Sequence, residues 1–400
     1  MKPILITGAG VVSAIGLNKA ETYDSLINEQ TGIGKLRYLL TGHKEFPVGE
    51  VKLSDDQMKE ILAIAEDVPT TRTFLMATIA MKEALAEARL LDNKSESVGL
   101  VSGTTVGGMD KSERFYLDYL GNDSRNAYIK THDCGACTEM TADYFGIFDV
   151  VTSISTACSS AANAIILGAN LIRAGQSEIV VVGGSECITK FHLNGFKSLM
   201  ILDGEQCRPF DNTRNGLNLG EGASYLVLET PASARRRGVK AIGMLSGYGN
   251  ACDAFHQTAS SSEGEGSYLA MSKALKMSGF KVSDIQYINA HGTGTPNNDA
   301  SESSAIKRLF GNDVPAISST KSFTGHTTSA SGSIEATICL LALQHQFLPI
   351  NLNWHEAMED GIIPVTNKRP SGELRNVMCN AFGFGGNDSS IILSSVGGGV

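Results

Sequence analysis

Charged side chains are scarce in this sequence. Lys, Arg, Asp and Glu make up 19% of the 400 residues, where roughly 25% is usual for soluble domains. The balance is acidic, with a formal net charge of −9. Binding to nucleic acid needs a concentrated Lys and Arg face that neutralises phosphates. The only dense basic cluster is Arg235–Arg237, which is followed by Gly238 and is typical of a solvated helix end, so we expect no nucleic-acid partner.

Long apolar runs are missing as well. No stretch of ~18 apolar residues occurs, which is the length needed to span a bilayer. The first apolar run, ILITGAGVV, is too short and too broken by glycine for the core of a signal peptide. We therefore expect a cytoplasmic protein without a membrane partner.

Metal and nucleotide signatures are incomplete. Cys134 and Cys137 have C-x-x-C spacing, but no second pair completes a zinc site. In TGAGVVSAIG the third glycine of a dinucleotide-binding fingerprint is replaced by Ser13. We predict instead a strand over residues 3–7 that ends in a glycine-rich turn at Gly8, and we expect neither a metal nor a nucleotide cofactor. The 8 cysteines are expected to be mostly buried, reduced thiols.

Glycine, in contrast, is abundant, at 43 residues, which indicates many tight turns and close backbone contacts. Between them, apolar strands alternate with helices. Helical spacing covers residues 72–90, and a helix that is apolar on most sides is predicted over 154–175. The strands expected at 98–104 and 178–184 are uninterrupted apolar runs, as in a parallel sheet covered on both faces.

A similar order returns after about residue 241. Helices are predicted over 265–278 and 299–310, and another apolar helix contains SIEATICLLALQHQ. A final strand pair follows around VMCNAFG and SSIILSS. The repeated order predicts an α/β protein of two related halves, residues 1–240 and 241–400.

Residues suited to thiol chemistry lie at the expected strand-to-helix junctions. Cys158, in STACSS, precedes a helix whose N-terminus would favour the thiolate. His291 lies in NAHGTGTP, and Lys321 and His326 lie in STKSFTGH. Each alone is compatible with a structural residue, but such junctions meet at one end of an α/β sheet, where active sites form. The stretch NAFGFGGND is either a plain hairpin turn or a source of backbone N–H groups for an oxyanion.

These motifs, in this order, resemble those of the elongating β-ketoacyl-acyl-carrier-protein synthases, condensing enzymes of the thiolase superfamily. The resemblance runs over nearly the whole chain and includes DNTRNGLNLGEGA at residues 211–223. It implies a thiolase-like fold, with two similar halves in a five-layered α-β-α-β-α arrangement. It also implies that the chain is an acyltransferase of fatty acid biosynthesis.

The resemblance assigns catalytic roles to five residues. Cys158 would be the nucleophile that takes an acyl group from a carrier-protein thioester. His291 and His326 would assist the decarboxylation of malonyl carrier protein and stabilise the enolate. Lys321 would set the electrostatics of the two histidines, and Glu335 would pair with it.

Substrate-binding roles follow in the same way. The backbone N–H groups of Cys158 and Phe384 would form the oxyanion hole, and Phe382 and Phe384 would form a gate. Residues assigned to binding phosphopantetheine or the acyl chain are Thr258, Thr293, Thr295 and Val106. No free cofactor is implied, because phosphopantetheine arrives on the acyl carrier protein. The resemblance further implies a homodimer whose acyl tunnel is completed near Val106 and residues 134–137.

Three departures from the family pattern stand out. Asn387 and Asp388 follow FGFGG, where the family usually has Thr-Asn. Polar residues 327–329 follow His326, where family members tend to be apolar and small. The segment 52–67, which often carries basic residues that dock the carrier, is net acidic. Docking is therefore expected to use other cations, such as Arg72, Lys111 and Arg114, or an atypical carrier.

Other functions remain as alternatives. The ACSS run and the stretch TTVGGMD at residues 104–110 favour a ketosynthase of an aryl polyene or polyketide pathway. A non-catalytic chain-length partner subunit would typically have lost the cysteine that is present here as Cys158. A degradative thiolase would use a second cysteine as base, for which Cys379 is the nearest candidate.

Overall fold

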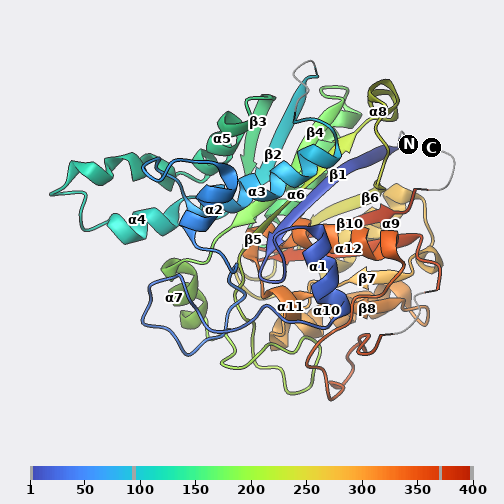
Figure 1. The fold of residues 1–400 in the computed structure, drawn as a ribbon. Coiled ribbons are helices and arrows are strands. Elements are labelled where there is room, and N and C mark those ends of the chain that lie inside the picture. Colours follow the sequence, from blue (N-terminus) through green and yellow to red (C-terminus); the bar gives the residue numbers. More distant parts are fainter. Residues whose placement is uncertain (1–2, 92–95, 369–371, 397–400) are drawn as a thin grey trace.

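The computed structural model describes residues 3–91, 96–368 and 372–396, which form helices packed on a mixed sheet (Figure 1). The strands are β1 (Ile4–Ser13), β2 (Val98–Gly103), β3 (Phe148–Ile154), β4 (Ile179–Glu186), β5 (Gly222–Glu229), β6 (Gly243–Cys252), β7 (Tyr287–Asn289), β8 (Ala316–Ser318), β9 (Asn376–Gly383) and β10 (Asn387–Ser394). The α-helices are α1 (Lys19–Ile27), α2 (Asp55–Leu62), α3 (Arg72–Glu87), α4 (Met109–Phe115), α5 (Cys134–Phe145), α6 (Ser160–Arg173), α7 (Lys190–Ser198), α8 (Pro231–Arg237), α9 (Glu265–Ser278), α10 (Pro296–Phe310), α11 (Lys321–Thr324) and α12 (Ser331–His345). Short 3-10 helices are η1 (Asp123–Tyr128), η2 (Lys130–His132), η3 (Val282–Asp284) and η4 (Thr328–Ala330).

The strand order divides the sheet into two matching parts. In the described residues it runs β3-β2-β4-β5-β1-β6-β10-β9-β7-β8, with β2–β4 in the upper part of Figure 1 and β7 and β8 in the lower part. If β6–β10 are renumbered as strands 1–5 of the second part, both parts have the same order. From the outer edge to the centre, each runs 3-2-4-5-1. The parts meet where residues 4–6 of β1 pair with residues 243–245 of β6. An internal duplication produces this kind of match.

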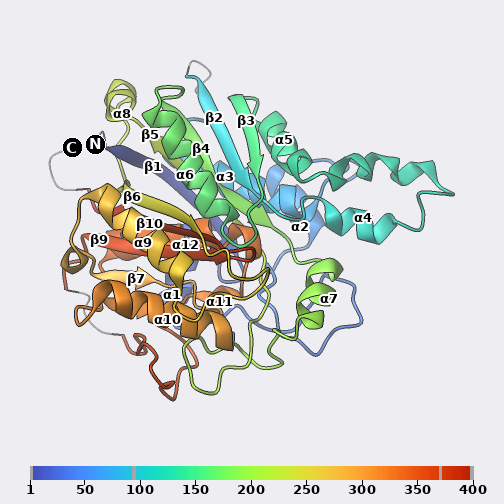
Figure 2. The ribbon, with the colours of Figure 1, turned by 180° about the vertical axis from the view of Figure 1, so that it is seen from behind.

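The helices complete the five layers that the sequence led us to expect. Helices α6 and α12 pack against each other in the middle, α6 on β2 and β4, and α12 on β5 and β9. Helix α3 covers the outer face of β1 and β5, whereas α9 covers β6 and β10 and packs on α10. Figure 2 shows the same layers from behind. Residues 331–343 of α12 are all buried, because a helix in the middle layer is surrounded by apolar neighbours.

The first strand is longer than the sequence pattern predicted. A turn was expected from Gly8, but β1 continues to Ser13. A Cβ on Gly8 would lie 2.2 Å from the carbonyl oxygen of Ala84 in α3. The prediction was wrong because a glycine inside a strand also marks a place where another backbone approaches closely.

This close contact is repeated in the second half. In each half, the first strand has two glycines that are two residues apart. They face two carbonyl oxygens that are four residues apart in the helix covering that strand, which is α3 for β1 and α9 for β6. The distances from an added Cβ to oxygen are 2.0 Å for Gly10 to Ala80, 2.4 Å for Gly247 to Ala274, and 2.2 Å for Gly249 to Ala270. Part of the glycine excess therefore serves strand-to-helix packing.

Most other predicted elements are present with shifted ends. Helix α9 spans residues 265–278, as predicted, and α3 ends at Glu87 rather than at residue 90. Helix α10 begins at Pro296, three residues before its predicted start. The helix expected over 154–175 begins only at Ser160, because the residues before it form the turn that carries Cys158.

The segment between β2 and β3 projects from the body (Figure 1). It contains α4, η1 and η2, and we refer to residues 109–132 as the arm. Tyr116, Leu117 and Leu120 on the arm are 72%, 88% and 101% exposed. Among the described residues, no helix is both long and apolar enough to cross a bilayer.

Candidate active site

Cys158 lies on a strained turn between β3 and α6. The residue before it, Ala157, has a positive φ of 51°, a conformation that costs energy for a residue with a Cβ. The hydroxyl of Ser160 stabilises this turn, since it accepts from the backbone N–H of Thr156 at 2.9 Å and donates to the carbonyl oxygen of Ala157 at 2.6 Å. Cys158 is only 5% exposed, so the turn presents a buried thiol.

Burial controls the protonation of this thiol. It raises the pKa of Cys158 to about 11, against the opposing effects of the Lys321 charge and of the backbone N–H groups of Phe384 and Cys158 itself. The sequence suggested a thiolate stabilised by the helix N-terminus. That expectation was wrong for the resting site, because α6 begins two residues further on and desolvation outweighs the N–H groups. A base must therefore take the thiol proton.

His326 is in position to take it. Its Nε2 lies 3.0 Å from Sγ of Cys158, and its Nδ1 lies 3.0 Å from the hydroxyl oxygen of Ser331. Burial, followed by the charges of Lys321 and His192, holds the pKa of His326 well below its usual value. The imidazole is therefore neutral at neutral pH and free to accept a proton.

His291 is the second imidazole of the site. Its ring centroid lies 5.3 Å from that of His326, and the two rings are almost perpendicular at 85°. Its backbone N–H donates to Glu302 at 2.9 Å. Burial, with the charges of Lys321 and His326, also holds the pKa of His291 well below its usual value. The site thus contains two neutral imidazoles.

Lys321 connects the histidines to a buried carboxylate. Its Nζ lies 3.3 Å from Nδ1 of His291 and donates to Glu335 on α12. Burial raises the pKa of Glu335 to about 7, and the Lys321 charge opposes that rise. An ammonium group can only donate hydrogen bonds, so this contact assigns the ring proton of neutral His291 to Nε2.

The reactive groups open into a cavity of about 310 Å³. Residues from several predicted motifs line it, namely Cys158, Thr258, His291, Thr293, Thr295, His326, Phe382 and Phe384. The hydroxyl oxygens of Thr293 and Thr295 lie 2.9 Å apart. The ring of Phe384 stacks on Phe196 of α7, with centroids 5.9 Å apart. The structure therefore brings these residues together, while Glu335 contributes from behind Lys321.

Val106 is the one predicted site residue that lies elsewhere. It is 1% exposed, it does not line this cavity, and its backbone N–H donates to the buried carboxylate of Glu186. Thr104 and Thr105 donate hydroxyl groups to the same carboxylate. Its predicted role at the end of an acyl tunnel stays a prediction.

Sequence reasoning missed three polar residues of the site. Ser331 orients His326, Glu302 anchors the main chain at His291 and Gly292, and His192 helps to lower the pKa of His326. Ser331 lies five residues after His326. Of the three, it is therefore the residue whose contact with the imidazole could most easily have been predicted. Glu302 and His192 lie on helices without a motif that marks them.

The other cysteines singled out above have different surroundings. Cys379 lies in β9, where its thiol contacts Cys339, and it does not line the cavity at Cys158. Cys134 donates to the carbonyl oxygen of Thr105, and Cys137 contacts the Thr71 hydroxyl. In the described residues, no group of three or more His, Cys, Asp or Glu side chains is placed to hold a metal ion.

A buried thiol that lies beside a neutral imidazole, and whose pKa the backbone N–H groups of Phe384 and Cys158 partly lower, suits acyl transfer through a covalent thioester. Comparison with family models agrees with this class. Residues 1–234 match the β-ketoacyl synthase N-terminal domain, and residues 242–355 match the β-ketoacyl synthase C-terminal domain. The chain belongs to the β-ketoacyl synthase family.

Curated relatives match over nearly the full length. Nodulation protein E of Rhizobium meliloti is 32% identical over 98% of this chain and 99% of its own length. 3-Oxoacyl-[acyl-carrier-protein] synthase 2 of Synechocystis sp. is also 32% identical, over 98% of this chain and 97% of its own length. Members of the family with this name are acyltransferases.

Solved structures share the fold. The ishigamide ketosynthase/chain length factor superposes with a TM-score of 0.91 at 28% identity, covering 99% of this chain and 100% of that one. The ketosynthase ApeO in complex with its chain length factor ApeC, from Xenorhabdus doucetiae, gives 0.85 at 29% identity, covering 99% and 98%. The thiolase-like fold predicted from the sequence is confirmed.

Proposed function

We propose that this chain is an active elongating β-ketoacyl-[acyl-carrier-protein] synthase, which extends an acyl group held on Cys158 by two carbons from malonyl carrier protein. The contact between Sγ of Cys158 and Nε2 of His326, at 3.0 Å inside the lined cavity, is the observation that carries this proposal. The family resemblance and the names of the relatives support it.

The first step is acyl transfer. His326 takes the proton of the Cys158 thiol as sulfur attacks the thioester carbonyl of the acyl carrier. The backbone N–H groups of Cys158 and Phe384, which lower the pKa of the resting thiol, donate to the oxyanion that forms. The carrier thiolate leaves and takes the proton from His326, so the imidazole is neutral again and the enzyme holds an acyl thioester.

The second step is decarboxylative condensation. Loss of carbon dioxide from the malonyl thioester leaves an enolate, whose oxygen accepts hydrogen bonds from neutral imidazoles. His291 suits this role because Lys321 assigns its proton to Nε2. The enolate carbon attacks the acyl-Cys158 carbonyl, a C–C bond forms, and the cysteine leaves as thiolate. The product is the β-ketoacyl carrier protein, and no resident cofactor takes part.

The cavity also suits the arm that delivers both substrates. Thr293 and Thr295 present a pair of hydroxyl groups beside Cys158, which can bind the amide groups of phosphopantetheine. Thr258 lines the same wall. Phe382 and Phe384 complete the entrance as the proposed gate.

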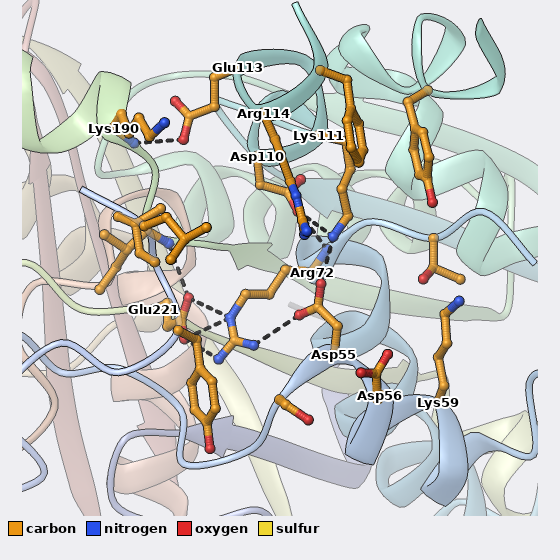
Figure 3. Close-up of a pocket in the computed structure, with 18 of the residues that line it drawn as sticks. Asp55, Asp56, Lys59, Arg72, Asp110, Lys111, Glu113, Arg114, Lys190 and Glu221 are labelled. Carbon is orange, nitrogen blue, oxygen red and sulfur yellow. Dashed lines mark hydrogen bonds and ion pairs between the residues drawn. The ribbon is translucent and has the colours of Figure 1, made fainter. Parts of the chain in front are cut away.

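Carrier docking cannot use all the cations named from the sequence. Arg72 is buried in ion pairs with Glu221 and Asp55, and Lys111 pairs with Asp55 and Asp110 (Figure 3). Both line a charged cavity of about 540 Å³. The expectation that they dock the carrier was wrong, because both are buried and paired with carboxylates.

Arg114 remains available for docking. It lies over the ring of Phe115, with Arg125 at 4.8 Å from the same ring. Lys190 lines the same cavity at the start of α7, the helix that also contributes Phe196 to the active-site cavity. We propose that an acidic carrier contacts Arg114, Arg125 and Lys190.

We propose that the edge of the sheet at β3 pairs with a second copy of the chain. β3 lies at one end of the strand order, and its Val150 and Val151 are 53% and 37% exposed. An edge strand with exposed apolar residues and free backbone groups is a pairing surface. The arm, which carries the exposed Tyr116, Leu117 and Leu120, projects from the same half of the molecule as β3 (Figure 1). Sedimentation of an active, stable monomer would count against this dimer.

Purified protein, malonyl carrier protein and an acyl carrier protein test the proposed reaction. We expect a β-ketoacyl product two carbons longer, whose formation requires Cys158. Failure of the wild-type protein to form this product, or its formation by the Cys158→Ala variant, would overturn the proposal.

The two structural neighbours that are ketosynthases with a chain length factor support a second candidate pathway. In it, the same condensation would serve a polyene or polyketide pathway, with a related subunit in place of the second copy. Mass spectrometry of the acyl-enzyme formed from carriers of graded length and unsaturation separates the two. A preference for unsaturated chains favours the second pathway, and a preference for saturated chains favours fatty acid synthesis.

A further inference from the structure

Asp388 is a buried carboxylic acid two residues after the glycine loop Gly383–Gly386. It is 2% exposed and lies at the start of β10, opposite Phe382 of β9 and Ala251 of β6. The proposed reaction gives it no role. At this position the sequence departs from the family pattern, which has Asn.

The groups that face Asp388 are acidic or weakly polar. Asp253 approaches it from the segment after β6, and a Cβ on Gly266 of α9 would lie 2.3 Å from Oδ2 of Asp388 and 2.8 Å from Cβ of Asp253. Ser267 donates its hydroxyl to Oδ2 at 3.4 Å. Burial, followed by the charge of Asp253, raises the pKa of Asp388 to about 7. Glu302 of α10 adds to this rise in the pKa of Asp388, and burial raises the pKa of Glu302 itself to about 7.

Asp253 accepts more and shorter hydrogen bonds than Asp388 does. It accepts the backbone N–H and the hydroxyl of Ser261, both at 2.7 Å, and the backbone N–H of Gly266 at 3.1 Å. Hydrogen bonds of this kind favour the charged form. Asp388, which has only a long bond from Ser267 at 3.4 Å and a raised pKa, is therefore the member of the pair that keeps a proton.

The same two residues hold the glycine loop. The carbonyl oxygen of Gly386 accepts from the backbone N–H of Asp253 at 3.0 Å and from that of Asp388 at 3.1 Å. The backbone N–H of Gly385 donates to Gln257 at 2.8 Å. Phe384, whose backbone N–H lowers the pKa of Cys158, is therefore tied to the segment 253–263.

This segment also forms part of the cavity wall. Thr258, Ala259 and Ser260 line the cavity, and the backbone N–H of Ser260 donates to the side chain of Asn297 at 2.8 Å. A movement of the segment away from the glycine loop would widen the cavity and release the backbone at Phe384 together.

We propose that Asp388 is a positioning residue, whose proton allows the glycine loop to lie against the segment 253–263 beside the ionised Asp253. When that proton is lost, two buried carboxylates repel each other, and the two segments separate. The oxyanion donor at Phe384 is then free to move. As a positioning residue Asp388 acts through the loop, and it does not touch the substrate.

The direction of the pH effect follows from linkage. In the seated form the glycine loop lies against the segment 253–263, and in the separated form the two have moved apart. A carboxyl group whose pKa is raised in the seated form binds more protons there than in the separated form. Seating is therefore favoured below the ordinary pKa of Asp and weakens as pH rises through about 7. If separation restores an ordinary pKa, opening increases by about tenfold between pH 6 and pH 8.

Hydrogen–deuterium exchange of the unliganded protein tests this without reference to catalysis. We expect peptides covering 253–263 and 383–388 to open up to about tenfold more at pH 8 than at pH 6, after correction for intrinsic exchange. Asp388→Asn should remove the pH dependence, and Asp313→Asn, at an exposed site, should retain it. Ser267→Ala removes the hydroxyl that stabilises the ionised form, so it should shift the transition to higher pH.

Exchange that is equally pH-dependent in Asp388→Asn, or pH-independent in the wild type, would overturn the proposal. If Asp388→Asn unfolds, the direction of the shift in Ser267→Ala decides. The kinetic consequence rests on the proposed function, and it predicts that Cys158 acylation by an acyl carrier loses part of its pH dependence in Asp388→Asn. Absence of acylation with intact exchange behaviour would contradict the proposed function only.

Discussion

The two halves of the molecule share one framework but divide the chemistry unequally. The junction from β3 to α6 carries Cys158, and the matching junction from β8 to α12 carries Lys321 and His326. The loop after β7 carries His291, whereas its counterpart after β2 holds Thr104 and Val106 against Glu186. The duplicated frame brings these junctions to one place. In the proposed reaction, one half supplies the nucleophile, and the other supplies the imidazoles and their cation.

The largest expected effect is on the nucleophile. Cys158→Ala should abolish acylation, because the strained turn offers no other thiol to the cavity. Intact-protein mass spectrometry after exposure to an acyl carrier should show one acyl group on the wild type and none on the variant. Cys252→Ala, which removes the exposed thiol beside the glycine loop, should acylate like the wild type. Acylation of Cys158→Ala would contradict the assignment.

The next effect concerns the other half. His326→Ala should slow acyl transfer by about 10²–10⁴-fold, the range for loss of a positioned acid–base group. Single-turnover acylation with the acyl carrier measures it. His355→Ala removes an exposed histidine and serves as the control. An unchanged rate in His326→Ala would show that the contact at 3.0 Å does not assist proton transfer.

A third effect is on stability, and it also lies in the second half. Lys321→Ala leaves the Glu335 carboxylate buried without its partner, which should cost about 3–5 kcal/mol in the free energy of unfolding. Denaturant unfolding measures this difference. Arg375→Ala, which breaks the exposed pair with Glu373, should leave stability nearly unchanged. Equal stability of both variants would mean that the buried pair contributes little.

The smallest expected effect tests whether the packing of the first strand on its covering helix is equivalent in the two halves. Gly8→Ala and Gly247→Ala should each cost about 1–3 kcal/mol, because both place a Cβ against a helix carbonyl oxygen, at 2.2 Å and 2.4 Å. Gly34→Ala, whose Cβ would meet nothing within 4 Å, is the control. Thermal unfolding compares the three variants. A large cost in only one half would show that the packing is not shared.

Sequence patterns predicted the order of helices and strands better than they predicted local geometry. The helical spacing of apolar residues predicted both ends of α9 correctly, because its apolar face is continuous over residues 265–278. The extent of β1 could not be predicted, because Gly8 is explained only by Ala84, which is remote in sequence. The division at residue 240 stays a prediction, supported by the matching strand orders.

The candidate site shows the same limit. Motifs placed Cys158, His291 and His326 near one another, as the structure does. They gave the wrong direction for the pKa of Cys158, because burial depends on the whole fold. Glu302 and His192 act through contacts between distant elements, and no local pattern marks them.

Carbon dioxide release from malonyl carrier protein tests the division between the halves most directly. We expect Cys158→Ala to release carbon dioxide without forming a condensed product, since both imidazoles and Lys321 remain. His326→Ala should lose this release although its thiol is intact. Loss of release in Cys158→Ala with retention in His326→Ala would contradict the account.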